Sequence, residues 1–190
     1  MNGSGKARVR YRVCKDVEHR AIVINGKLKS FPLDGVLPED AIVVYRIQAL
    51  EDISDDVHKG DFGGYVQSMM NLQHVYYEDD DSWIYDDAAV CGDAFVGYGG
   101  KMYDRSIAQC GNTMNVQGVA MVISGSELHG DSAIIGRVVL TNNTRLYNTC
   151  IINSGVDGSI DVRTGSLYRN CAFENVDMTT ARRLVPYPNL

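Results

Sequence analysis

The stretch VQGVAMVISGSELHGDSAIIGRVVLTNNTRLYNTCII, residues 116–152, carries an aliphatic residue at every sixth position. The same step runs from residue 66 to residue 114 in a register shifted by two, with one polar member, Glu78. No helical face repeats every six residues, so the step indicates a repeat of short strands. The members are Val66, Leu72, Glu78, Ile84, Val90, Val96, Met102, Ala108 and Met114, then Val116, Val122, Leu128, Ile134, Leu140, Leu146 and Ile152.

Small residues and turn formers surround these apolar positions. The residue two before is usually Ala, Gly, Ser, Thr or Cys, and Gly, Asn, Asp or Ser follow two or three positions after. Positions i and i+2 of a strand point to the same side, so each unit places one small and one aliphatic side chain inward. The turn formers supply positive φ or side-chain hydrogen bonds where the chain changes direction. The pattern therefore predicts an all-β parallel β-helix of the hexapeptide type, with three units to a coil and coils about 4.8 Å apart.

Two segments resemble the hexapeptide-repeat family of left-handed parallel β-helices, whose best-known members are acyltransferases. WIYDDAAVCGDAFV, residues 83–96, looks like the repeats of that family. YRIQALEDISDDVHKGDFGGYV, residues 45–66, resembles the opening of a bacterial and phage subset often described as transferases or hypothetical proteins. The resemblance covers residues 45–175 or so and implies the left hand of the coil and a phage origin.

The chain before the repeat has the features of a small β module. RVRYRV, residues 8–13, alternates between arginines and apolar residues. Ala21–Ile24 and Lys27–Phe31 flank Asn25-Gly26, a signal for a type I′ hairpin. A further strand is expected over Ala41–Leu50.

Three parts are expected along the chain. Residues 1–60 form an N-terminal β-hairpin module that caps the first coil, because a terminal coil exposes strand edges. Residues 61–176 form the hexapeptide-repeat β-helix, and residues 177–190 form a C-terminal tail. In that tail we expect one short helical turn over Thr179–Leu184, stopped by Pro186.

Composition predicts a folded cytoplasmic protein. The chain has 190 residues, of which 45% are hydrophobic and 22% charged, which suits one globular domain. The longest apolar run, Ala41–Tyr45, is far shorter than the roughly 20 residues that span a bilayer, and MNGSGKARVR lacks the apolar centre of a signal peptide. Five cysteines without a CxxC pair indicate reduced, buried thiols and no zinc site. We therefore expect no membrane and no metal.

The net charge of −6 is unevenly distributed. Residues 1–30 hold eight Lys and Arg against two acids, whereas the rest holds ten against 22. The acidic body disfavours extended nucleic acid as a partner. Arg8, Arg10 and Arg12 fall on one face of the expected strand, where guanidinium groups suit a small anionic ligand such as a phosphate. The alternative is a charged outer face of an edge strand, which deters aggregation.

An acidic run, Glu78–Asp81, precedes the regular repeats. Calcium needs oxygen ligands that converge from alternate positions, whereas this run is contiguous. We therefore expect a solvated corner, or a contact with the arginine face.

His129 follows the inward Leu128, so it should point outward beside the turn Gly130-Asp131. The resemblance implies a role for an outward histidine, since acyltransferases of the family use one as general base near a subunit interface. His129 is therefore the catalytic candidate if the protein is an acetyl-coenzyme A-dependent acyltransferase, and otherwise a turn residue facing solvent. The sequence shows neither a long loop between coils nor a C-terminal extension for coenzyme A, which favours a non-catalytic protein.

Three functions remain open. The first is a non-catalytic, oligomeric β-helix binding protein, phage-encoded, that sequesters a small anionic ligand or engages a host protein, without a cofactor. The second is the acyltransferase, and the third is a structural or assembly protein. Outward apolar residues predict a homotrimer, because a monomer seldom exposes such a set and flat triangular faces pack around a threefold axis. These residues are Phe95, Ile107, Met121, Ile123, Ile135, Val139 and Ile151.

Overall fold

The protein is all-β throughout the part of the chain that the computed structural model describes. Within that part there is no α-helix, only one 3-10 turn, η1 (Met69–Asn71), and no helix there has the length and apolar character needed to cross a membrane. The described residues are 9–24, 26–73, 80–110, 120–122, 125–135, 138–140, 145–147, 150–152, 160–162, 167–169, 171–174 and 185–186.

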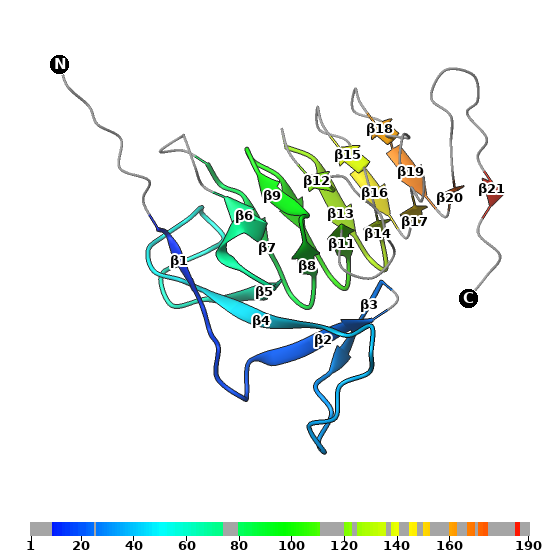
Figure 1. Ribbon diagram of the computed structural model, residues 1–190. Coiled ribbons are helices and arrows are strands. Elements are labelled where there is room, and N and C mark those ends of the chain that lie inside the picture. The colour runs from blue at the N-terminus through cyan, green and yellow to red at the C-terminus, as the bar shows by residue number, and fades with distance from the viewer. Residues whose placement is uncertain are drawn as a thin grey trace.

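From β5 onward, every third strand along the chain pairs in parallel, which produces three sheets side by side (Figure 1). Together they are called the three-sheet region. Sheet 1 contains β5 (Phe62–Val66), β8 (Ala89–Gly92), β11 (Ile107–Cys110), β14 (Ala133–Ile135), β17 (Cys150–Ile152) and β20 (Cys171–Glu174). Sheet 2 contains β6 (Leu72–Gln73), β9 (Phe95–Gly97), β12 (Met121–Val122), β15 (Val138–Leu140) and β18 (Ile160–Val162). Sheet 3 contains β7 (Trp83–Ile84), β10 (Lys101–Met102), β13 (Glu127–His129), β16 (Arg145–Tyr147) and β19 (Leu167–Arg169).

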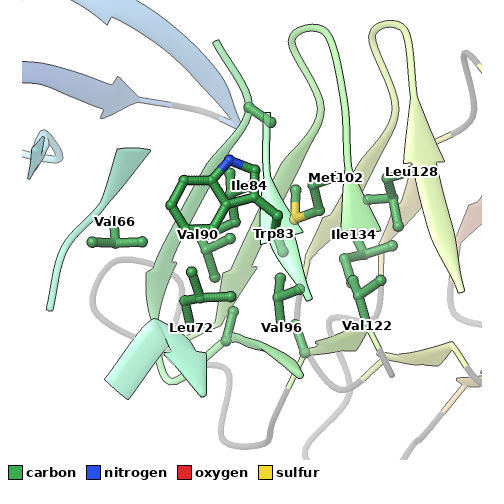
Figure 2. Close-up of a cluster of buried hydrophobic side chains, with 14 of the residues drawn as sticks. Val66, Leu72, Trp83, Ile84, Val90, Val96, Met102, Val122, Leu128 and Ile134 are labelled. Carbon is green, nitrogen blue, oxygen red and sulfur yellow. The ribbon is translucent and has the colours of Figure 1, made fainter. Parts of the chain in front are cut away.

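One apolar column from each sheet faces a common interior (Figure 2). The pairing stacks like positions of successive units, for example Val90 on Ala108 and Ala108 on Ile134. The small residues two positions earlier, such as Ala94, Ala120 and Ser132, are buried as well. Eleven residues that the step of six predicts to be inward are fully buried, which confirms those positions. They are Val66, Ile84, Val90, Val96, Met102, Ala108, Val122, Leu128, Ile134, Leu140 and Leu146.

The step of six fails by one residue at β17. Ile134 pairs with Ile151, which is fully buried. The prediction that Ile151 is outward is therefore wrong, and the predicted inward side chain of Ile152 lies outside what the structure describes. Side chains alternate along a strand, so a shift of one residue exchanges the two faces. Both positions are isoleucine, and hydrophobicity does not distinguish them.

Longer segments than the repeat predicts join two pairs of strands. Ala108 of β11 and Val122 of β12 are the inward residues of two consecutive strands, although they lie more than two hexads apart in the sequence. Residues 111–120 separate β11 from β12, so the expectation of no long segment between coils is wrong. Leu72 and Ile84 are likewise two hexads apart. Glu78, Met114 and Val116 lie outside the described residues.

Four N-terminal strands extend sheet 1 with antiparallel pairing. They are β1 (Tyr11–Val13), β2 (Arg20–Ile24), β3 (Lys27–Ser30) and β4 (Ile42–Ala49). The predicted hairpin is confirmed, since β2 pairs with β3 across Gly26, which has a φ of 67°. β4 pairs with β1, β2 and β5, and these strands, together with β21 (Val185–Pro186) beside β20, make sheet 1 an 11-stranded sheet that ends at β3.

The N-terminal strands cover more of the three-sheet region than a cap on the first coil would. Val23 of β2 and Val44 of β4 share one buried cluster with Cys91 and Ile107 on the outer face of sheet 1. Ile107 is therefore 1% exposed, and its prediction as an exposed trimer residue is wrong. Tyr11 reaches the end of the region, where its ring meets Trp83 edge to face.

At the other end, β21 (Val185–Pro186) pairs antiparallel with β20. Pro186 thus lies in a strand pair. The expected helical turn over Thr179–Leu184 is outside the described residues, and the boundaries at residues 60 and 176 stay predictions.

Candidate functional site

The outer face of sheet 3 carries two ordered columns of side chains. Inward Met102 and Leu128 alternate with outward neighbours, and the parallel register brings equivalent neighbours together. One column, called the aromatic column, consists of Tyr85, Tyr103, His129 and Tyr147. The other, called the charged column, consists of Lys101, Glu127 and Arg145.

The rings of the aromatic column stack face to face. Successive ring centroids are 4.6, 4.5 and 4.6 Å apart, and the planes deviate by 6°, 4° and 7°. This spacing is close to the roughly 4.8 Å between paired strands, so the parallel register itself sets the ring distance. Both faces of Tyr103 and of His129 are therefore covered by neighbouring rings. All four side chains are half-buried.

The column has a sequence signal that the step of six alone does not show. Tyr85 and Tyr103 follow inward positions that lie three hexads apart, and so do His129 and Tyr147. The longer segment between β11 and β12 puts Tyr103 and His129 26 residues apart, so alignment of the units by threes reveals two pairs and not the whole column. Of these four residues, only His129 was predicted as a site residue.

His129 lies outward on β13, as predicted, but not as an isolated turn residue. Its ring is sandwiched between Tyr103 and Tyr147, and its Nε2 lies 2.9 Å from Glu127 Oε2. Among the described residues, no hydrogen-bond partner of Nδ1 is present. The imidazole is thus fixed by two rings and one carboxylate.

The charged column is neutralised by ion pairs within the same face. Lys101 Nζ lies 2.6 Å from Asp81 Oδ2, and Arg145 Nε lies 2.9 Å from Glu127 Oε2. Burial by itself would lower the pKa of Lys101, but the Asp81 carboxylate, with Tyr85 and Glu127 nearby, raises it overall. Lys101 therefore stays charged and is neutralised by its ion pair with Asp81.

Two tyrosines of this face, Tyr85 and Tyr103, have a raised pKa. Burial is the main cause that raises the pKa of Tyr103, and the neighbouring Tyr85 and Glu127 raise it further. Burial also raises the pKa of Tyr85, against an opposing effect of Lys101. Tyr85 and Tyr103 therefore present neutral hydroxyl groups at physiological pH.

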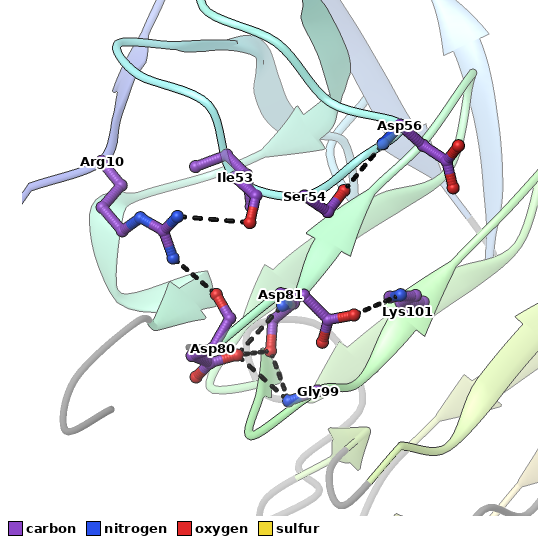
Figure 3. Close-up of polar contacts among 9 residues, drawn as sticks. Arg10, Ile53, Ser54, Asp56, Asp80, Asp81, Gly99 and Lys101 are labelled. Atoms are coloured by element: carbon purple, nitrogen blue, oxygen red, sulfur yellow. Dashed lines mark hydrogen bonds and ion pairs between the residues drawn. The ribbon is translucent and has the colours of Figure 1, made fainter. Parts of the chain in front are cut away.

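The two described arginines of the expected row, Arg10 and Arg12, are both bonded to groups of this chain. Arg8 is outside the described residues, and Arg12 is exposed and donates to Gln48 Oε1. Arg10 is 9% exposed and donates to the Glu51 carboxylate at 2.8 Å. Arg10 donates in addition to the Asp80 carbonyl at 2.6 Å (Figure 3). It also donates to two further carbonyls, those of Asp52 and Ile53. β1 begins only at Tyr11, so the alternation does not place Arg10 on an outer face, and that expectation is wrong.

The acidic run is not a solvated corner at Asp80, which is 5% exposed. Its carboxylate accepts hydrogen bonds from the backbone N–H groups of Ser82, Tyr98 and Gly99, at 3.0 to 3.1 Å, and from the Ser82 hydroxyl. Asp80 therefore holds the turn at Gly99, which has a φ of 77° (Figure 3). Glu78 and Asp79 are outside the described part, within which no three His, Cys, Asp or Glu side chains are grouped to hold a metal ion.

The fold and this face define an all-β protein with one mixed and two parallel sheets and an aromatic and ionic outer surface. No family model matches the chain, and neither a curated protein nor a solved structure matches it. The hexapeptide-repeat family remains an expectation from the resembling segments.

Proposed function

We propose that the protein is a non-catalytic, homo-oligomeric binding protein built on a left-handed parallel β-helix of the hexapeptide-repeat type. Pairing of every third strand and the buried aliphatic columns support the β-helix. The left hand and the phage origin rest on the resemblance of residues 45–66 and 83–96. The protein acts in the bacterial cytoplasm, where it engages a host protein.

The outer face of sheet 3 carries this proposal. Its rings are stacked on one another, and its described charges, on Lys101, Glu127 and Arg145, are paired within the face. Such a face is flat and rigid, and contact with a macromolecule requires little reorganisation of it. Aromatic and arginine side chains are also enriched in protein interfaces.

Engagement of a protein is favoured over sequestration of a small anion. Arg10 is used in four hydrogen bonds to groups of this chain, and Arg12 already binds Gln48. Neither guanidinium therefore offers a phosphate a pair of parallel N–H donors that are not already used.

A homotrimer through sheet 2 fits the faces that the N-terminal strands leave uncovered. Phe95 and Met121 are half-buried outward neighbours in register, and Val139 follows in the same register. Native mass spectrometry of freshly purified protein should show three chains and report any retained ligand. We expect Phe95→Asp to dissociate the trimer and Phe62→Asp, on the exposed side of β5, to leave it intact. A wild-type mass of one chain would exclude the oligomer.

The acyltransferase remains the second candidate because of one specific contact. Glu127 binds Nε2 of His129, which leaves Nδ1 as the atom that would accept a proton from an acyl acceptor. Loss of a general base costs about 10²–10⁴-fold in rate. We expect wild-type protein to show neither acetyl-coenzyme A turnover nor saturable coenzyme A binding by calorimetry. Turnover that is lost in His129→Asn but kept in the exposed control His58→Asn would establish the enzyme instead.

A further inference from the structure

The 11-stranded sheet has an open edge at β3. β3 pairs with β2 on one side, and no other strand of the described chain pairs with its far side. Lys27, Lys29 and Ser30 are exposed, whereas Leu28 packs against the buried cluster under β2. An open edge presents backbone N–H and C=O groups that can pair with another strand.

An ordered turn with exposed aliphatic side chains follows this edge. Leu33 is fully exposed, and Val36 is 69% exposed. The Gly35 N–H donates to the Pro32 carbonyl at 3.1 Å, and the Val36 N–H donates to Asp34 Oδ1 at 3.0 Å. The segment between β3 and β4 projects from the molecule away from the three-sheet region (Figure 1). Its own hydrogen bonds thus hold apolar side chains in solvent, as in a preformed contact site.

We propose that β3 and the turn at residues 32–37 form a docking surface for an acidic, extended segment of a partner protein. The segment adds a strand to the edge of β3, and its aliphatic residues cover Leu33 and Val36. This inference rests on the proposed binding function and names the place and the chemistry of that binding.

Charge selects this partner over a second copy of the chain. Lys27 and Lys29 lie two residues apart and therefore on the same side of β3. Opposite charges across paired strands stabilise the pairing, and like charges oppose it. A second β3 would bring two more lysines to the same side, whereas glutamates at alternate positions of a partner strand would neutralise them. An anionic membrane is disfavoured as well, because Asp34 lies between the exposed aliphatic residues.

A defined peptide tests the surface. The probe is a fluorescein-labelled peptide of eight alternating Glu and Val residues, with a proline at each end against self-association, and the comparator has Lys in place of Glu. We expect fluorescence anisotropy to give a Kd on the order of 100 µM for the acidic peptide, a value typical of a small interface. Hydrogen exchange should slow at β3 amides when the acidic peptide is present.

Matched variants locate the contact. Lys27→Glu with Lys29→Glu should weaken binding by about tenfold or more, and Leu33→Ser with Val36→Ser by several-fold. Lys15→Glu, an exposed charge reversal in the β1–β2 connection, is the control and should bind like wild type.

Four results would overturn the docking surface: failure of the acidic peptide to bind, equal binding of the basic peptide, equal effects of the edge and control variants, or a changed oligomeric mass in Leu33→Ser with Val36→Ser. Retention on vesicles of phosphatidylserine, lost in the same variant, would show a membrane contact in its place. The acetyl-coenzyme A assay reports separately on the proposed function. If the acidic peptide does not bind and acetyl-coenzyme A is not turned over, only the docking surface is rejected. Turnover that requires His129 rejects the proposed binding function.

Discussion

The outer faces of sheets 1 and 3 belong to the same repeat, but one is buried by other strands and the other is exposed to solvent. On sheet 1, the outward residues are small or apolar, such as Ala89, Cys91 and Ile107, and β2 and β4 bury them. On sheet 3, outward Lys101 and Glu127 remain partly exposed and pair within the face. The inward columns behind both faces are equally buried.

This difference shows that outward residues decide what covers a face. Burial of apolar area stabilises by about 25 cal/mol per Å², so the face with Ile107 gains from the N-terminal strands. Covering Lys101 and Glu127 would remove water from charges, which costs free energy unless every charge keeps a partner. Inward residues form the common interior of the three sheets. Outward residues decide whether a face is buried under other strands or stays exposed to solvent.

The largest expected effect comes from the interior that both faces share. Leu140→Asp places a carboxylate in a column where Leu140 is fully buried, and we expect a loss above about 4 kcal/mol, enough to unfold the three-sheet region. Circular dichroism and thermal melting measure it. Leu140→Met is the control and should cost less than about 1.5 kcal/mol. An unchanged melt of Leu140→Asp would show that Leu140 is not inward.

The next effect concerns the attachment of the N-terminal strands. Arg10→Met leaves the carbonyls of Asp52, Ile53 and Asp80 without their donor, and we expect a loss of about 3 kcal/mol in the free energy of unfolding. Arg12→Met, at an exposed position, should cost less than about 0.5 kcal/mol. Urea unfolding of both variants tests the contrast. Equal midpoints would mean that Arg10 does not anchor this end.

The packing of β2 and β4 on sheet 1 can be weakened at Val23, which is fully buried in the cluster with Cys91. Val23→Ala should cost about 2 kcal/mol and expose Cys91 to thiol reagents. Burial raises the pKa of Cys91 to about 12, so in wild type the neutral thiol should react slowly near pH 8. Val43→Ala, on the other side of β4, is the control. Equal labelling of Cys91 in both variants would contradict the cover.

The smallest effect is alkaline destabilisation through the aromatic column. Burial raises the pKa of Tyr103 in the folded protein, so the unfolded chain loses this proton first, near pH 10. The contribution of Tyr103 to stability is complete below pH 10 and falls as pH rises toward the folded pKa. Tyr103→Phe should therefore show a shallower decline of Tm above pH 10 than wild type. Tyr45→Phe serves as the control, and a slope like that of wild type in Tyr103→Phe would contradict the assignment.

The parts of the fold that depend on local period were predictable from sequence. The step of six located the inward residues from Val90 to Ala108 and from Val122 to Leu146, and Asn25-Gly26 located the hairpin. Each signal lies within a few residues and states which side of a strand is apolar or where the chain turns. The outward position of His129 followed from the same alternation.

Only the tertiary structure decided the rest. The choice of Ile151 over Ile152 depends on the pairing of β17 with β14, since both residues are equally apolar. Arg10 binds carbonyls of residues far along the chain, and His129 joins a column whose members come from separate strands. The burial of Ile107 requires β2 and β4 to lie across sheet 1. These contacts depend on distances between remote segments, which a local pattern does not contain, whereas the step of six is a property of neighbours and survives in the sequence itself.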